Sequence, residues 1–186
     1  MDFGVRYGIE DMTTTPTELP PRLREILTPT MGKPSFLDVR PRPDSEFNDC
    51  TEDIRRQTEE HGGSAVLGWT VWERPTAFLF TEFHTVWESP IGELLDVSAK
   101  ADGEPRILFI PDSSICYTGV RIHGTHLPLT DDPVVLEHIS AHEDYWEVFD
   151  RTYGADCLDD VRPTPEVAML SMRRALAIAA LDQHYP

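Results

Sequence analysis

The chain has 186 residues, of which 40% are apolar, and 33 Asp and Glu residues against 16 Lys and Arg residues give it a formal net charge of −17. This charge repels the phosphate backbone of nucleic acids, and no cluster of basic residues offsets it locally. A chain of this length buries enough apolar surface to fold without a metal or disulfides. The composition therefore argues against a nucleic-acid-binding protein and against a small disulfide-rich or metal-stabilised fold.

The cysteines and the apolar runs bear on the compartment. Cys50, Cys116 and Cys157 are widely spaced and form neither a disulfide framework nor a CxxC zinc motif, which favours a reducing compartment. The first residues lack the basic and then apolar order of a signal peptide, and no apolar run approaches 18 residues. We therefore predict a cytoplasmic protein with no membrane span. Since GxGxxG and Walker motifs are absent, we expect no cofactor.

The first 47 residues are rich in proline and threonine. They are predicted to form an arm with one short helix over residues 17–27. Residues 48–186 are predicted to form a single α+β domain. Its first element is a helix over residues 48–61, because polar residues that suit a cap begin this segment and a double glycine follows it.

The middle of the chain has the pattern of β-strands. Three segments, residues 64–75, 76–89 and 92–99, alternate apolar with polar or small residues and are rich in β-branched and aromatic types. Residues 106–114 and 115–124 are predicted to add two more strands.

Two helices are predicted near the C-terminus, over residues 132–152 and 165–181. The second carries an apolar stripe with the spacing of a packing face: Ala168, Met169, Met172, Ala175, Leu176 and Ala179. The order of elements predicts an α+β fold, in which an antiparallel sheet follows a Cys-bearing helix and precedes two C-terminal helices.

Cys50 is the candidate nucleophile. It follows Asn48 and Asp49, either of which suits a helix cap, so its sulfur is predicted to lie at the first helical position. The unpaired N–H groups and the positive end of the helix dipole favour a thiolate there. A nucleophilic thiolate also needs an imidazole within hydrogen-bond reach and an acceptor that fixes the tautomer of that imidazole.

His84 and Asp96 are the candidates for those two roles. The connection Ser89-Pro90-Ile91-Gly92 suits a three-residue hairpin loop in which glycine takes the left-handed position. In that register Ser89 faces Glu93, and His84 and Asp96 become diagonal neighbours on one face of the sheet. A two-residue loop would place them on opposite faces.

The order Cys50 on a helix, His84 on a following strand and Asp96 on the next strand resembles the papain-like thiol enzymes of the transglutaminase and arylamine N-acetyltransferase kind. The stretch from HGGSAVLGWTVWERP to EFHTVWESPIGELLDVS is also similar to a motif of uncharacterised bacterial proteins. The resemblance covers roughly residues 48–98. It implies attack of a thiolate on the carbonyl of an amide, ester or thioester in a small-molecule or protein substrate, but it does not fix that substrate.

Further residues are candidates for contact with the substrate. Trp69, Trp72 and Trp87 are aromatic residues suited to the wall of a cleft, and Glu82 is predicted to share the face of His84, where it is also a second possible orienting acid.

Two alternative functions remain open. One is a non-enzymatic interaction or regulatory protein that binds a partner through an acidic surface and exposed aromatic residues. The other is a small metal-binding protein that uses two histidine pairs, since HxxH and HxxxH spacing occurs in the C-terminal half. The residues of these pairs are His123 with His126, and His138 with His142.

Overall fold

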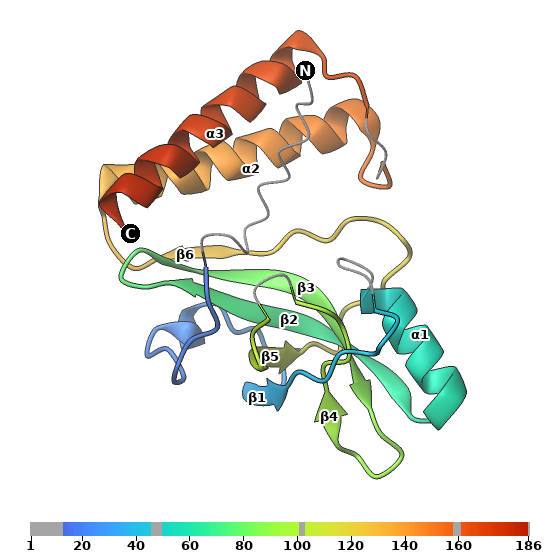
Figure 1. Cartoon of the computed structure of the whole chain (residues 1–186). Coiled ribbons are helices and arrows are strands. Elements are labelled where there is room, and N and C mark those ends of the chain that lie inside the picture. Colours follow the sequence, from blue (N-terminus) through green and yellow to red (C-terminus); the bar gives the residue numbers. More distant parts are fainter. Residues whose placement is uncertain (1–12, 46–49, 101–102, 158–160, 186) are drawn as a thin grey trace. The chain divides into compact units, whose positions relative to one another are not determined.

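The computed structural model describes residues 13–45, 50–100, 103–157 and 161–185 (Figure 1). The helices are α1 (Cys50–His61), α2 (Pro133–Tyr153) and α3 (Pro165–His184). The strands are β1 (Ser35–Asp38), β2 (Ser64–Arg74), β3 (Phe78–Glu88), β4 (Leu94–Leu95), β5 (Arg106–Pro111) and β6 (His126–Pro128). This arrangement confirms the predicted α+β fold with its Cys-bearing helix before the sheet and its two C-terminal helices.

The sheet has the strand order β1-β5-β2-β3-β4, and β6 pairs with β3. Strand β5 pairs antiparallel with both β1 and β2, with Ile107 opposite Leu37 and Leu108 opposite Val71. Successive residues of β5 belong to two separate apolar clusters, because neighbouring side chains of a strand point to opposite faces. The sheet is therefore buried on both faces at β5, which explains the uninterrupted apolar run in that strand.

The proline-rich N-terminal segment is more structured than the sequence predicted. In place of a helix over residues 17–27 it forms only the 3₁₀ turn Leu23–Glu25, which follows two consecutive prolines. It also contributes β1 to the edge of the sheet, although the predicted arm contained no strand. Leu37 of β1 is buried and packs with Ile107, so this part of the segment belongs to the core.

The chain divides into two compact units. The sheet unit comprises residues 1–73, 79–116 and 123–125, and the helical unit comprises residues 74–78, 117–122 and 126–186.

In the helical unit, α2 and α3 pack side by side (Figure 1). Each begins with a capped proline turn: the side chain of Asp132 accepts from the N–H of Val134, and the side chain of Thr164 accepts from the N–H of Val167. No helix among the described residues combines the length and the apolar character needed to cross a membrane.

The face of α3 that packs differs from the predicted one. The buried residues of α3 are Val167, Ala177, Ile178 and Leu181. The predicted packing stripe is instead exposed, and Met172 has 67% of its surface accessible. The prediction was wrong because apolar residues occur on nearly every side of this helix, so their spacing does not single out one face.

The predicted strand over residues 115–124 is absent. The middle of this segment, residues 117–122, is part of the helical unit, and hydrogen bonds within that unit hold it instead. The N–H of Arg121 donates to the carbonyl of Ala155, and its guanidinium pairs with Asp150 and donates to the carbonyl of Cys157. Gly119 has a φ of 85°, a left-handed conformation that an extended strand does not contain. These contacts outweigh the alternating pattern.

Candidate active site

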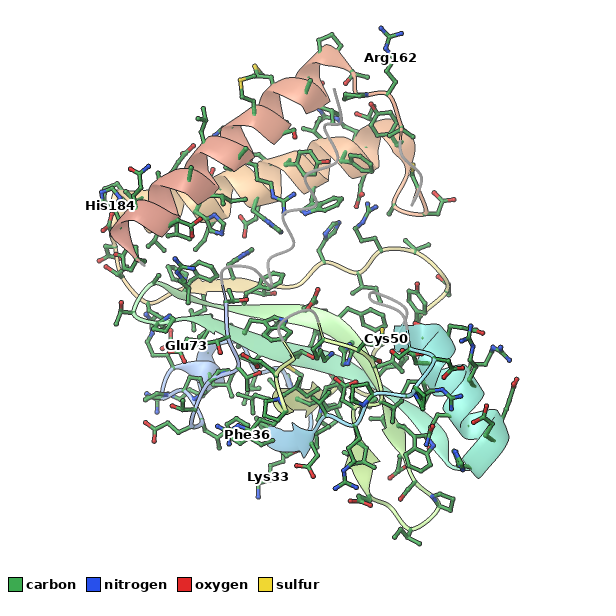
Figure 2. The ribbon with its side chains drawn as sticks, in the orientation of Figure 1. Lys33, Phe36, Cys50, Glu73, Arg162 and His184 are labelled. Carbon is green, nitrogen blue, oxygen red and sulfur yellow. The ribbon has the colours of Figure 1, made fainter. Side chains whose placement is uncertain are left out.

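Helix α1 places Cys50 at its first position, as predicted, and Figure 2 shows this residue at the start of the helix. The predicted caps, Asn48 and Asp49, lie outside the described residues. One turn further on, the buried side chain of Ile54 packs against Trp87, Leu95 and Val97. This apolar contact fixes the helix to the β3–β4 hairpin and so sets where the sulfur lies.

The hairpin has the predicted register. Trp87 lies opposite Leu95, and the N–H of Ser89 donates to the carbonyl of Glu93 at 2.8 Å. Gly92 has a φ of 82°, the left-handed conformation required at the end of a three-residue loop. The register that places the candidate histidine and aspartate on one face is therefore confirmed.

After the short strand β4, the chain turns away from β3 and pairs with other residues. Backbone N–H groups of β3 beyond this point therefore have no partner in β4. The N–H of Asp96 donates to the carbonyl of Asp38 at 3.1 Å, and its own carbonyl accepts from Arg40 at 2.8 Å. On β3, two residues beyond the last ladder pair, the N–H of Thr85 donates to the sulfur of Cys50. A backbone donor that normally pairs with the next strand thus stabilises negative charge on the thiol.

His84 and Asp96 form a buried hydrogen bond. The Nε2 atom of His84 lies 2.9 Å from Oδ2 of Asp96, and both side chains are almost fully buried. The other carboxylate oxygen, Oδ1, accepts from the N–H of Ser98 at 2.9 Å. Although burial disfavours a carboxylate, the charge and hydrogen bond of His84 hold the pKa of Asp96 well below its usual range.

Cys50 and His84 are hydrogen-bonded to each other, which completes the chain of three residues. Burial opposes ionisation of the thiol, but the hydrogen bond and charge of His84, with smaller contributions from the N–H of Thr85 and the charge of Lys100, together lower the pKa of Cys50 below its ordinary value. Burial also opposes the imidazolium, yet the charge of Asp96 and the hydrogen bonds to Asp96 and Cys50 together outweigh it and raise the pKa of His84 to about 9. Together these shifts favour a thiolate–imidazolium pair at neutral pH.

A fourth charged residue, Lys100, was not found by sequence reasoning. Its Nζ lies 2.8 Å from the same Oδ2 atom of Asp96, and its side chain is only 7% exposed. Its place in the sequence, four residues after Asp96 in an irregular segment, has no motif or periodicity that predicts this contact. The one available signal is its rarity, because Lys33 is the only other lysine of the chain.

The predicted substrate contacts lie in different environments. Trp72 is buried and donates from Nε1 to Glu82 at 2.7 Å, whereas Trp87 is buried against α1 and donates to the carbonyl of Gly62. Trp69 is partly buried and donates to Asp112 at 3.0 Å. Trp69 and Glu82 keep some exposed surface, so a substrate has more access to them than to the other two. Their part in binding remains a prediction.

Three of the four residues of the predicted histidine pairs lie together in the structure. His126, His138 and His142 lie together in the helical unit, with ring centroids of His126 and His142 4.8 Å apart, whereas His123 is exposed. Within the described ranges, no group of three or more His, Cys, Asp or Glu side chains is arranged to hold a metal ion. The geometry therefore gives the metal-binding alternative no support.

Comparison with known proteins adds no assignment. No protein-family model, no curated protein and no solved structure matches the chain. The resemblance to papain-like enzymes therefore stays a prediction, and the functional argument depends on the geometry of this site.

Proposed function

We propose that the protein is a thiol-dependent hydrolase or transferase that acts on the carbonyl of an amide, ester or thioester. Cys50 is the nucleophile, His84 the general base and acid, and Asp96 the residue that orients the imidazole. The observation that carries this proposal is the hydrogen-bonded chain from Cys50 through His84 to Asp96 within the sheet unit. The sequence order of the three residues, which resembles that of papain-like enzymes, supports it further.

The chemistry follows from the positions of the three side chains. The thiolate of Cys50 forms a bond to the carbonyl carbon, and the electron pair of the C=O bond moves to oxygen. The first N–H groups of α1 have no partner within the helix, so they are suited to bind this oxyanion. When the C=O bond re-forms, the leaving group departs with the proton of the imidazolium of His84. Water or an amine then attacks the acyl carbon while His84 takes its proton, and as the C=O bond re-forms the C–S bond breaks, so Cys50 leaves as a thiolate and the thiolate–imidazolium pair is restored.

The proposal includes a reducing, cytoplasmic setting. All three cysteines of the chain are free thiols in the structure, and a free nucleophilic thiol persists best where glutathione and thioredoxin keep cysteines reduced. The substrate is a small molecule or a protein segment that presents an acyl group to Cys50.

Acylation by an activated ester tests the reaction directly. We expect p-nitrophenyl acetate to acetylate Cys50 with release of p-nitrophenolate, and peptide mass spectrometry to find the acetyl group on that residue. The Cys50→Ala variant should release no p-nitrophenolate in this step. His84→Ala should slow the acetylation of Cys50 by at least about 100-fold, the typical contribution of general base catalysis. Equal release from wild type and Cys50→Ala would overturn the proposal.

The pH dependence of alkylation tests the thiolate–imidazolium pair without any substrate. We expect iodoacetamide to modify Cys50 with a midpoint below the ordinary thiol pKa of about 8.5, and His84→Ala to move that midpoint up to or above this value. Cys116 is exposed and serves as a reference thiol in the same molecule. If Cys50 reacts only at alkaline pH in both proteins, the interaction-protein alternative becomes the better explanation.

A further inference from the structure

Lys100 is a buried cation in direct contact with the proposed triad. A buried ammonium is costly unless a counter-ion compensates it. Oδ2 of Asp96 lies 2.8 Å from Nζ of Lys100 and 2.9 Å from Nε2 of His84, so one carboxylate oxygen accepts from both cations. Nζ and Nε2 are 3.3 Å apart. The charged site thus contains four residues rather than three.

The positions of the protons follow from these distances. The ammonium of Lys100 has hydrogen atoms to donate and no lone pair to accept with. Nε2 of His84 faces a carboxylate oxygen, so it must carry a hydrogen as well. The 3.3 Å approach between Nζ and Nε2 is therefore a contact between two donors that share one acceptor. This tautomer leaves the lone pair of Nδ1 free to take the proton of the Cys50 thiol.

Hydrogen bonds of the neighbouring residues aim Lys100 at the site. The N–H of Ser98 donates to Asp96 Oδ1, which turns the chain back towards that carboxylate. The N–H of Ala99 donates to Oγ of Ser45 at 2.7 Å, and Oγ of Ser45 donates to Asp53 of α1 at 2.6 Å. The lysine is thus attached to the helix that begins with the nucleophile.

We propose that Lys100 is a positioning residue of this site, which shares Asp96 with His84 and weakens the hold of Asp96 on the imidazolium proton. The inference rests on the proposed function, because it concerns how the same triad is charged. With Cys50 and Asp96 negative and His84 and Lys100 positive, the four groups sum to zero. Without Lys100, the ionised triad would leave a net negative charge in a largely buried place.

The remaining carboxylates near the triad are engaged with other partners. Glu82, two residues before His84 on β3, accepts from Trp72, and Asp53 of α1 accepts from Ser45. Among the described residues, Lys100 is therefore the one residue outside the triad whose charged group contacts the Asp96 carboxylate. Its positive charge acts to lower the pKa of both His84 and Cys50, so its removal should raise both.

The test uses two readouts on the full chain: the midpoint of Cys50 alkylation by iodoacetamide, and the pKa of His84 from the NMR titration of its Cε1–H resonance. In Lys100→Met both values should rise by about one unit, the lower end of what a nearby charge produces. Lys100→Gln keeps a hydrogen-bond donor but removes the charge, so both values should rise by a similar amount. In Lys100→Arg, which keeps the charge, both values should stay near those of the wild type. Lys33→Met is the matched control, since Lys33 is exposed beside β1, away from Cys50 (Figure 2).

The direction of the His84 shift separates an electrostatic role from a structural one. If Lys100 only held the fold together, its loss would open the site and the pKa of His84 would fall from about 9 towards its ordinary 6.5. Such a fall, or unchanged values in both Lys100→Met and Lys100→Gln, would overturn the inference. A different result would contradict the proposed function itself: a pH midpoint of Cys50 alkylation in the wild-type protein that is not lowered, or that does not change in His84→Ala.

Discussion

Both units of the molecule bury histidines, but one unit favours the charged form of its imidazole and the other favours the neutral form. In the sheet unit, His84 lies against the Asp96 carboxylate, and its pKa is raised to about 9. In the helical unit, burial lowers the pKa of His126 to about 3 and that of His138 to about 4, and no carboxylate contributes to either shift. Burial alone drives an imidazole towards its neutral form, and one well-placed carboxylate reverses the direction.

The surroundings of the two kinds of histidine match this difference. His138 stacks on the ring of Phe78 with centroids 5.2 Å apart, and its Nδ1 atom has no hydrogen-bond partner among the described residues. Nearby, Arg174 lies over the rings of Tyr145 and Trp146, and its positive charge further disfavours protonation of His138. The surroundings of His84 therefore favour its charged form, while those of His126 and His138 favour neutral, packed imidazoles.

Removal of Asp96 should have the largest effect. Asp96→Ala leaves His84 and Lys100 buried without their counter-ion, which should lower the free energy of unfolding by about 3–5 kcal/mol in urea denaturation. The loss should be greatest between pH 3.8 and 6.5, the ordinary values of the two groups. Below this window Asp96 begins to be protonated in the unfolded state and then in the folded state, and above it the benefit of charged His84 declines up to about pH 9.

The same substitution should make His84 resemble the histidines of the helical unit. In Asp96→Asn, an isosteric change, the pKa of His84 should fall from about 9 to near or below its ordinary 6.5, because burial and Lys100 are then opposed only by the hydrogen bond to Cys50. NMR titration of His84 measures this directly. A pKa that stays near 9 would show that the carboxylate does not cause the difference between the two units.

A smaller effect is expected from His138→Leu. Because the pKa of folded His138 lies below its unfolded value, the unfolded state binds more protons and stability falls as the pH drops from 6.5 towards 4. Each such group contributes a slope of up to about 1.4 kcal/mol per pH unit. The variant should lose this part of the slope in urea unfolding followed by helical circular dichroism. His123→Leu, at an exposed residue, should retain it.

The site was predictable from the sequence to the extent that local rules determined it. Proline and glycine around Ile91 fix the hairpin loop, the loop fixes the register, and the register brings His84 and Asp96 together. The polar start and double glycine of α1 likewise place Cys50 at the first helical position. These features depend on a few adjacent residues, so a single sequence contains enough information to find them.

Features that depend on tertiary contacts were missed. Lys100 reaches Asp96 because Ser45, from a distant segment, fixes the backbone at Ala99. Strand β1 forms because β5 offers an unpaired edge, which a proline-rich segment by itself does not reveal. The segment over residues 115–124 has a strand pattern but is fixed by the guanidinium of Arg121. In each case the deciding partner lies many residues away.

The smallest expected effect concerns the apolar stripe of α3, and it completes the contrast between the units. The helical unit buries imidazoles inside and leaves Met169, Met172 and Leu176 exposed, whereas the sheet unit buries apolar clusters around β5. Because Met172 is 67% exposed, Met172→Gln should change the free energy of unfolding by no more than about 0.5 kcal/mol.

Leu181→Ala is the matched comparison on the same helix, since Leu181 is fully buried and its truncation should cost about 2–5 kcal/mol. Urea denaturation followed by helical circular dichroism measures both variants. A loss of 2 kcal/mol or more in Met172→Gln would mean that the stripe is a packing face after all, as its spacing in the sequence predicted. A near-neutral result beside a large loss at Leu181 would show that α3 is held by the face opposite its methionines, and that helical spacing alone misidentifies the core when apolar residues surround a helix.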